Sequence, residues 1–247
     1  FAIVGGGPTG VELAGTLAEI AKHTLKDEFR NIDPASARVR LVEAGPRVLA
    51  AFPDDLSAKA KRQLEKLGVE ISTGTPVKEI NADGYQLGET FVPAKTVVWA
   101  AGVAASPLGA MLGTALDRAG RVQVQPDLSV PGHPDIFVAG DLAALLQANG
   151  KPVPGVAPAA KQMGKLAARN IRARLSGSKT AAFAYKDYGN LATIGRMAAV
   201  VDLGRLKFSG LLAWWFWLVM HVFFLIGFRN RLVVLLNWWW AYWSYQR

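Results

Sequence analysis

Residues 1–21 of the chain read FAIVGGGPTGVELAGTLAEIA. An apolar run of four residues leads directly into Gly5, Gly7 and Gly10, which follow the spacing G-x-G-x-x-G. Apolar residues then recur at helical spacing from Val11 to Ala21. A strand, a glycine-rich turn and a helix in this order are typical of a dinucleotide-binding unit, in which the helix N-terminus faces a pyrophosphate.

The strand expected next, residues 39–43, ends in an acidic residue, Glu43. A carboxylate at this place accepts hydrogen bonds from ribose hydroxyls and repels a 2′-phosphate, so the pattern favours NADH over NADPH. Glu43 stands 33 residues beyond Gly10, more than the usual ~20, and a long helix with a loop at 31–36 would account for the excess. The alternative is that this segment binds no dinucleotide. The glycines would then be an ordinary strand–helix turn, and Glu43 would be a solvated strand end.

The following segments complete one Rossmann-like unit, predicted to be an NADH-binding domain at residues 1–103. A helix is expected to begin at Asp54 and to end before Gly68, followed by a strand at 69–72. Short strands at 77–80, 85–87 and 90–92, with a turn at Asp83-Gly84, predict an antiparallel meander. A last strand at 96–99 runs into Ala100-Ala101-Gly102.

The composition excludes several classes of protein. The 247 residues are 51% hydrophobic and include 25 glycines, which excludes disordered and fibrous chains. Cysteine is absent, so disulfide scaffolds, thiol catalysts and iron–sulfur clusters are excluded. His23, His133 and His221 stand far apart, and no metal site is expected.

A second region follows the first unit. Residues 121–125 predict a strand, residues 127–131 a loop, and an apolar strand begins at Asp135 and ends in Gly140-Asp141. A helix is expected over residues 159–175, where apolar residues recur at helical spacing.

Four ordered motifs give the sequence a specific resemblance. GGGPTGVELAGTL (5–17), VVWAAGV (97–103), DIFVAGD (135–141) and GFRNR (227–231) together resemble type II NADH dehydrogenase, a single-subunit NADH:quinone oxidoreductase that does not pump protons. The resemblance implies an α/β, two-dinucleotide-binding flavoprotein architecture in which the NADH domain is inserted in the FAD domain. Residues 104–180 would then be only the C-terminal part of the FAD-binding domain. The family's other glycine-rich loop, for the ADP half of FAD, has no counterpart here, so a fragment of a longer polypeptide is expected.

The resemblance also implies FAD and NADH as cofactors and assigns residues to them. The implied cofactor-binding residues are Gly5, Gly7, Pro8, Thr9, Gly10, Glu43, Ala101, Gly102, Gly140, Asp141 and Ala157. Catalytic roles are implied for Glu12, near the nicotinamide and flavin, and for Gln162, in the segment that matches the family's AQxAxQ-type motif. Pro158 stands at the first glutamine position of that motif, which is a departure from the family pattern.

Residues 181–247 are predicted to be a C-terminal membrane-anchoring region. Seven of the eight tryptophans fall in the last 34 residues, and no acidic residue follows Asp202. The seven tryptophans belong to two apolar runs, residues 211–228 and 232–245, which are separated by Arg229-Asn230-Arg231. Eighteen residues are at the lower edge of a spanning helix and fourteen are too few. The sequence leaves open a surface-bound pair of helices, a re-entrant hairpin and a buried soluble hairpin.

The expected function is therefore transfer of hydride from NADH to FAD and of electrons to a membrane quinone in a respiratory chain. The expected location is the inner face of a bacterial cytoplasmic membrane, with the lipid surface as a partner and without nucleic acid. The oligomeric state stays open, a homodimer included. One alternative is another FAD- and NAD(P)-dependent pyridine nucleotide oxidoreductase, although those that need cysteines are eliminated. The other is a membrane-bound nucleotide-binding or redox-sensing module without catalysis.

Overall fold

The computed structural model describes residues 1–26, 28–225 and 227–244. Two compact units are present: one comprises residues 1–102 together with 189–247, and the other comprises residues 103–188. Tyr245 and Arg247, which belong to the apolar, basic tail of the sequence, lie outside the described residues.

The first unit is built on a parallel sheet of four strands in the order β3-β2-β1-β7. Its strands are β1 (Ala2–Val4), β2 (Arg40–Glu43), β3 (Glu70–Thr73) and β7 (Val97–Trp99). Ile3 of β1 is in register with Leu41 of β2 and Val98 of β7. All four strands were predicted, and their parallel pairing confirms the Rossmann-like interpretation.

Two helices cover one face of this sheet. They are α1 (Pro8–Glu19), continued by a π-helical turn (Ile20–Thr24), and α2 (Asp54–Lys66); a 3-10 turn (Pro34–Ser36) lies in the loop before β2. Their apolar faces bury Val11, Leu56 and Leu64 against Leu41 of the sheet. The helical spacing of the apolar residues therefore determines which side of each helix packs on the core.

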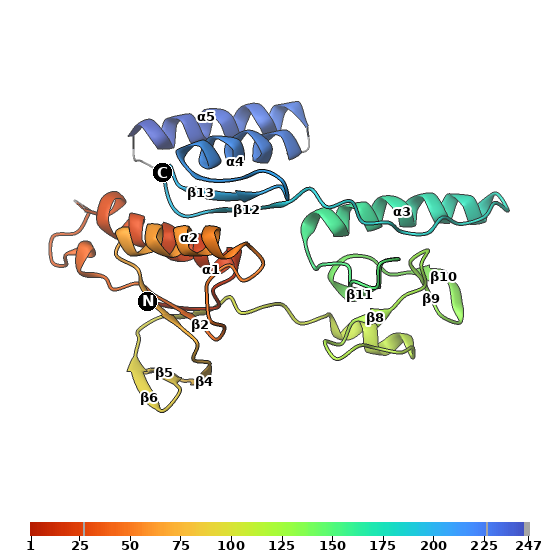
Figure 1. Ribbon diagram of the computed structural model, residues 1–247, viewed down its shortest axis with the longest axis horizontal. Helices are drawn as coiled ribbons and strands as arrows, with labels where there is room; N and C mark the ends of the chain where they lie inside the picture. Colours follow the sequence, from red (N-terminus) through yellow and green to blue (C-terminus); the bar gives the residue numbers. More distant parts are fainter. Residues whose placement is uncertain (27, 226, 245–247) are drawn as a thin grey trace. The chain divides into compact units, whose positions relative to one another are not determined.

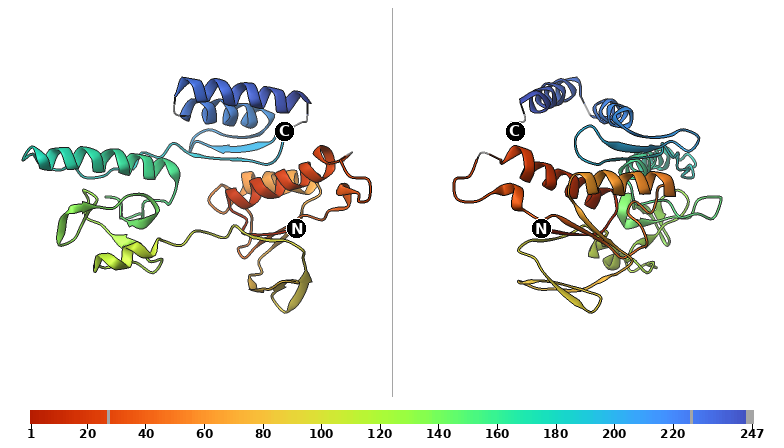
Figure 2. Two further views of the ribbon diagram at one scale, coloured as in Figure 1. Left: turned by 180° about the vertical axis from the view of Figure 1, so that it is seen from behind. Right: turned by 60° about the vertical axis from the view of Figure 1, so that its left-hand side comes forward.

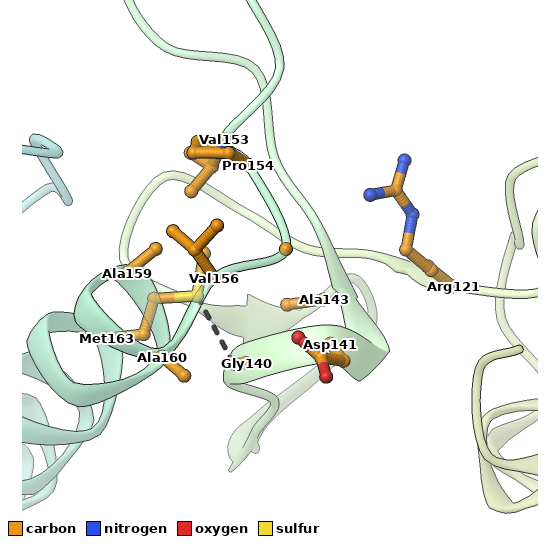
Figure 3. Close-up of a pocket in the computed structure, with 11 residues that line it drawn as sticks. Arg121, Gly140, Asp141, Ala143, Val153, Pro154, Val156, Ala159, Ala160 and Met163 are labelled. Atoms are coloured by element: carbon orange, nitrogen blue, oxygen red, sulfur yellow. Dashed lines mark hydrogen bonds between the residues drawn. The ribbon is translucent and has the colours of Figure 1, made fainter. Parts of the chain in front are cut away.

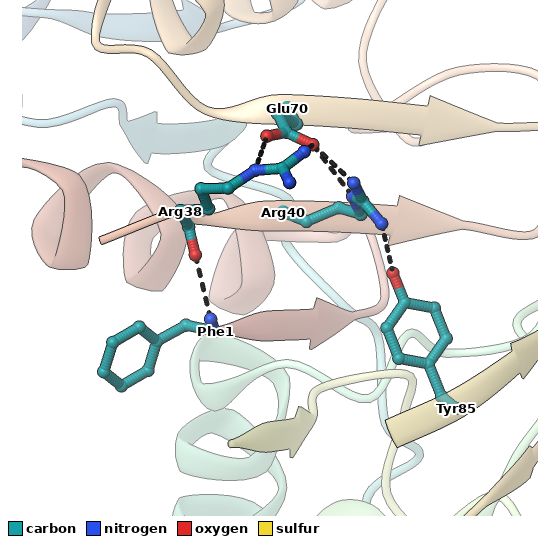
Figure 4. A network of polar contacts seen from close by, with 5 residues as sticks. All are labelled: Phe1, Arg38, Arg40, Glu70 and Tyr85. Atoms are coloured by element: carbon teal, nitrogen blue, oxygen red, sulfur yellow. Dashed lines mark hydrogen bonds and ion pairs between the residues drawn. The ribbon is translucent and has the colours of Figure 1, made fainter. Parts of the chain in front are cut away.

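The opposite face of the sheet carries the predicted meander. Strands β4 (Val77–Ile80), β5 (Gly84–Leu87) and β6 (Thr90–Pro93) form an antiparallel sheet in that order. Tyr85 is buried there against Ala2 and Val42. Its hydroxyl lies 3.5 Å from Arg40, which also binds Glu70 together with Arg38 (Figure 4).

A second antiparallel sheet, which was not predicted, covers the other side of α1 and α2. It consists of β12 (Asn190–Thr193), β13 (Ala199–Asp202) and β14 (Lys207–Gly210). Figure 1 shows α1 and α2 between the parallel sheet and this sheet, and both views in Figure 2 show the same layers. Ile194 and Val200 join the core of α1 and α2, whereas Val201 faces Ala213 and Trp214.

The last two helices pack on this second sheet and on each other. They are α4 (Leu211–Phe224) and α5 (Phe228–Ser244). Trp217 of α4 stacks on Trp238 of α5 with ring centroids 5.5 Å apart. Arg229, Asn230 and Arg231, which separate the two apolar runs of the sequence, lie in the first turn of α5. None of the helices in the described ranges is long and apolar enough to pass through a lipid bilayer.

The second unit is small and has one long helix. Strand β8 (Val122–Gln123) pairs with β11 (Ala143–Ala144), and β9 (Ser129–Val130) pairs with β10 (His133–Phe137). Short 3-10 helices (Pro107–Leu112, Gly140–Leu142) and α3 (Ala157–Leu175) complete it. The expected loop at 127–131 is wrong in part, since β9 lies within it, and the strand expected at 121–125 is only two residues long. Met163 and Leu128 lie in its core.

Candidate functional site

The glycine-rich turn connects the carboxyl end of β1 to the first turn of α1. Gly5 has a φ of +113°, and a Cβ there would lie 2.6 Å from the carbonyl carbon of Ala100, so only glycine fits. A Cβ on Gly10 would lie 1.8 Å from the carbonyl oxygen of Gly5. Gly7, in contrast, has no heavy atom within 4 Å of its ideal Cβ position. The first and third glycines therefore make the close packing, and the second faces open space.

The first turn of α1 has free hydrogen-bonding capacity. Gly7 is the N-cap residue in an extended conformation, and no side chain caps the helix. Pro8 occupies the first helical position, where its missing N–H has no consequence. The N–H groups of Thr9 and Gly10 have no intrahelical acceptor because of their place in the helix. Together with the helix dipole, these groups favour an anion such as a pyrophosphate.

Glu43 lies at the end of β2, next to this turn. Its Oε2 accepts a hydrogen bond from the N–H of Gly6 at 2.5 Å, and its Oε1 accepts one from the N–H of Gly45 at 2.7 Å. Each carboxylate oxygen keeps a further lone pair, so the side chain can also receive ribose hydroxyls. Glu43 thus fixes the conformation of the glycine turn, a role that sequence analysis did not predict.

Ala101 and Gly102 follow β7, the strand that pairs with β1 on the side opposite to β2. Both are exposed, and Gly102 has a φ of +103° with no atom within 4 Å of its ideal Cβ position. Since the strands are parallel, their carboxyl ends lie at one edge of the sheet, beside the turn of Gly5–Gly10. The structure thus brings the predicted NADH-binding residues of this unit together.

Glu12 lies in the first half of α1 and reaches the second sheet. Its Oε1 accepts a hydrogen bond from the N–H of Thr193 in β12 at 3.3 Å. Burial raises the pKa of Glu12, while hydrogen bonds from Thr193 and the charge of His221 lower it to a smaller extent. A half-buried carboxyl with a raised pKa can exchange a proton closer to neutral pH than a solvated one.

Gly140 and Asp141 line a pocket of the second unit together with Val156 and Ala159, the residues on either side of the start of α3 (Figure 3). Gly140 has a φ of +73°, and its N–H donates to Sδ of Met163 at 3.3 Å. Asp141 lines the same pocket, and Ala157 begins α3, whose first turn no side chain caps. These features fit one edge of a flavin site, with an uncapped helix N-terminus, a carboxylate and a glycine. The pocket encloses only about 10 Å³, close to the space of one water, so these residues form an edge rather than a complete pocket.

Gln162 makes two hydrogen bonds to one residue. Its Nε2 donates to the carbonyl oxygen of Lys186 at 2.9 Å, and its Oε1 accepts the N–H of Lys186 at 3.0 Å. Asn170, two turns later in α3, is paired in the same way with Ala181. The amide of Gln162 therefore holds the segment after α3, and its catalytic role remains a prediction.

Three contributors to the two sites were missed by sequence analysis. Thr193 binds Glu12, Met163 binds Gly140, and Gly6 binds Glu43. Met163 has the helical spacing of a core residue, and nothing near Thr193 in the sequence indicates a partner 181 residues away. In the described part of the chain, no group of three or more His, Asp or Glu side chains could hold a metal ion.

The sequence of the chain matches two known protein-family models. The sequence model of the pyridine nucleotide-disulphide oxidoreductase family matches residues 1–164. The chain therefore belongs to the pyridine nucleotide-disulphide oxidoreductase family. A second model, described as the NDH2 C-terminal domain, matches residues 188–242 and indicates the type II NADH dehydrogenase branch.

Individual relatives agree with this branch. The chain is 46% identical over 250 residues to a type II NADH:quinone oxidoreductase of Mycobacterium tuberculosis, with 96% of this chain and 53% of the relative covered. It is 33% identical to a mitochondrial internal alternative NAD(P)H-ubiquinone oxidoreductase of Arabidopsis thaliana, with 96% and 49% covered. The predicted resemblance to type II NADH dehydrogenase is thereby confirmed. The chain spans about half the length of these curated relatives.

Solved structures support the fold. The structure of NDH2 from Plasmodium falciparum in complex with NADH matches with a TM-score of 0.89 at 19% identity, covering 100% of this chain and 66% of that one. An FAD-dependent pyridine nucleotide-disulphide oxidoreductase from Desulfovibrio vulgaris matches with a TM-score of 0.59 at 24% identity, covering 81% and 47%. The predicted Rossmann-type α/β architecture is confirmed.

Proposed function

We propose that this chain supplies the NADH site and one edge of the flavin site of a non-proton-pumping NADH:quinone oxidoreductase. The observation that carries the proposal is the junction of β1, the glycine turn and α1, with Glu43 at the neighbouring strand end. Gly7 leaves room for a pyrophosphate, and the N–H groups of Thr9 and Gly10 would bind it. Glu43 would receive the ribose hydroxyls and disfavour a 2′-phosphate.

FAD is the cofactor that we propose for the whole protein, where it would supply the two-electron chemistry between NADH and quinone. Gly140 would let the flavin approach the backbone, and Asp141 would accept hydrogen bonds from its ribityl hydroxyls. The uncapped N-terminus of α3 at Ala157 would stabilise negative charge on a reduced flavin. Glu12 would hold or release a proton close to the nicotinamide, since burial raises its pKa.

We propose that the surface of α4 and α5 binds a membrane, where the quinone dissolves. Both helices expose large apolar side chains in the first unit: Leu212, Trp215, Val219, Phe223, Phe228, Leu236, Trp239 and Trp240. Apolar side chains mixed with tryptophan are typical of a bilayer interface, and the two helices carry no acid. A location at the inner face of a bacterial cytoplasmic membrane is part of this proposal.

The nucleotide site is tested by titrating the chain with NADH and NADPH. We expect NADH to bind at least tenfold more tightly, since a carboxylate opposes the 2′-phosphate. Equal affinities, or no binding of either nucleotide, would contradict the proposed site.

The membrane surface is tested with three substitutions on α5, Leu236→Gln, Trp239→Gln and Trp240→Gln, which leave α4 in place. Truncation after Asp202 is unsuitable, because it removes β14 and the buried Trp214. We expect the triple variant to keep NADH affinity and to lose most of its binding to neutral lipid vesicles. Unchanged vesicle binding would contradict a membrane role of this surface.

A further inference from the structure

One face of α3 carries a row of basic side chains. Lys161, Lys165, Arg169 and Arg172 follow each other at intervals of four, four and three residues, and all four are exposed. At roughly 100° per residue they fall within one side of the helix. The buried side, with Ala159, Met163, Leu166 and Asn170, faces the opposite way. We refer to the four residues as the basic face of α3.

In the part of the chain that the structure describes, the basic face has no neighbouring counter-charge. Among the described residues, none of these four side chains lies within ion-pairing distance of a carboxylate. Helix α3 itself contains no acidic residue. Arg174, by contrast, lies 3.6 Å from Asp127 and 3.9 Å from Asp135, and its guanidinium covers the ring of Phe137. The second unit as a whole has ten basic and five acidic residues.

An apolar strip runs beside the basic face. Ile171 is 45% exposed and Leu175 is 84% exposed, and both lie on the same side of α3 as the exposed Gly164 and Ala168. Figure 1 shows α3 along one side of the strands of its unit, rather than among them. A helix side that combines unpaired cations with an apolar border is typical of contact with an anionic lipid surface.

We infer that the basic face of α3 is a binding surface for anionic lipid headgroups, and that it makes membrane attachment depend on lipid charge. Four cations in a row of about three helical turns match an extended anionic surface better than a small anion, because an exposed helix side cannot enclose one. Single-stranded nucleic acid is less suited, since binding it also requires aromatic side chains for base stacking, and α3 has none. The inference adds a second contact to the membrane attachment proposed for α4 and α5, and in that respect it rests on the proposed function.

The test compares the chain with the variant Lys161→Gln, Lys165→Gln, Arg169→Gln and Arg172→Gln. Glutamine keeps helix propensity, and circular dichroism would verify the fold. A matched control removes the same charge from α2 through Lys59→Gln, Lys61→Gln, Arg62→Gln and Lys66→Gln. Each protein is sedimented with phosphatidylcholine vesicles and with vesicles containing phosphatidylglycerol, in about 0.1 M salt.

We expect the unmodified chain and the α2 control to prefer anionic vesicles by roughly tenfold or more, given the effect of each basic group near an anionic leaflet. The α3 variant should lose most of this preference and keep its binding to neutral vesicles. If the α3 variant and the α2 control behave alike, the inference is wrong. A parallel titration with a single-stranded oligonucleotide tests nucleic acid as the ligand. If the α3 variant loses binding to the oligonucleotide and keeps its binding to anionic vesicles, the inference is overturned in favour of nucleic acid. Binding of the unmodified chain to neutral vesicles separates these outcomes from a failure of the membrane attachment proposed for α4 and α5, and NADH titration of the same samples separates them from a failure of the proposed nucleotide site.

Discussion

The carboxylate of Glu12 in α1 accepts a hydrogen bond from the backbone N–H of Thr193 in β12, at 3.3 Å, across 181 residues of sequence. The contact joins α1 to a sheet that belongs to the C-terminal part of the chain. Burial raises the pKa of this carboxyl, so its ionised form is less stable in the folded protein than in water.

This raised pKa predicts how Glu12→Gln changes stability with pH. A carboxyl whose folded pKa exceeds its unfolded pKa makes its most favourable contribution below the unfolded pKa and loses it as pH rises through the folded pKa. Glutamine keeps an acceptor for Thr193 and carries no charge. We therefore expect urea denaturation to show Glu12→Gln gaining stability relative to the unmodified chain between pH 4 and pH 7.5. A difference that does not change with pH would contradict the assignment; Glu65→Gln, on the exposed side of α2, is the control.

The glycines of the turn predict two different effects of the same substitution. Gly10→Ala would put a Cβ 1.8 Å from the carbonyl oxygen of Gly5, so we expect destabilisation by about 3 kcal/mol or more. Gly7→Ala has no atom within 4 Å of the new Cβ and an ordinary φ of −71°, so its stability should change by less than about 1 kcal/mol. Its methyl would occupy the space proposed for the pyrophosphate, and NADH affinity should fall at least tenfold. Thermal unfolding and NADH titration measure the two effects, and a Gly7→Ala variant that binds NADH normally would contradict the proposed pose.

Glu43→Gln separates a role in the turn from a role in nucleotide selection. The side chain now accepts N–H groups from Gly6 and Gly45, and an amide can accept only one of them well. Loss of a charge-assisted hydrogen bond is worth about 1.5–3 kcal/mol, so we expect NADH to bind tenfold or more weakly. NADPH should weaken much less, because the charge that repels its phosphate is gone. Equal weakening of both nucleotides in a calorimetric titration would mean that Glu43 acts only through the turn.

Glu70 predicts a loss of stability in acid. Arg38 and Arg40 donate hydrogen bonds to its carboxylate and lower its pKa to about 2. A depressed folded pKa gives stability that is present above the unfolded pKa near 4.5 and is lost as pH falls toward 2. The side chain of Glu70 is 38% exposed, so solvent screening reduces the effect to about 1 kcal/mol. Between pH 6 and pH 3, the free energy of unfolding of Glu70→Gln, measured with urea, should fall by less than that of the unmodified chain.

Arg38 and Arg40 are expected to contribute unequally to this loss of stability in acid. Arg40 is 25% exposed and also contacts Tyr85, whereas Arg38 is 73% exposed (Figure 4). Arg40→Gln should therefore reduce the acid sensitivity more than Arg38→Gln, since a partly buried pair is screened less by solvent. The reverse order would show that exposure does not control the strength of these pairs.

Elements that have a local cause can be predicted from the sequence alone. Gly5 and Gly10 predict the turn because any Cβ there would collide with backbone, and residue spacing predicts α1, α2 and the meander β4–β6 because periodicity of 3.6 or 2 follows from backbone geometry. The four motifs likewise identified the family. Features that depend on distant segments follow from tertiary packing: the sheet β12–β14, the pairing of Glu12 with Thr193 and the hydrogen bonds between Gln162 and Lys186. Such contacts form when the folded chain brings together groups whose local sequence carries no sign of the partner, since each polar group that becomes buried must find an acceptor or donor wherever packing places one.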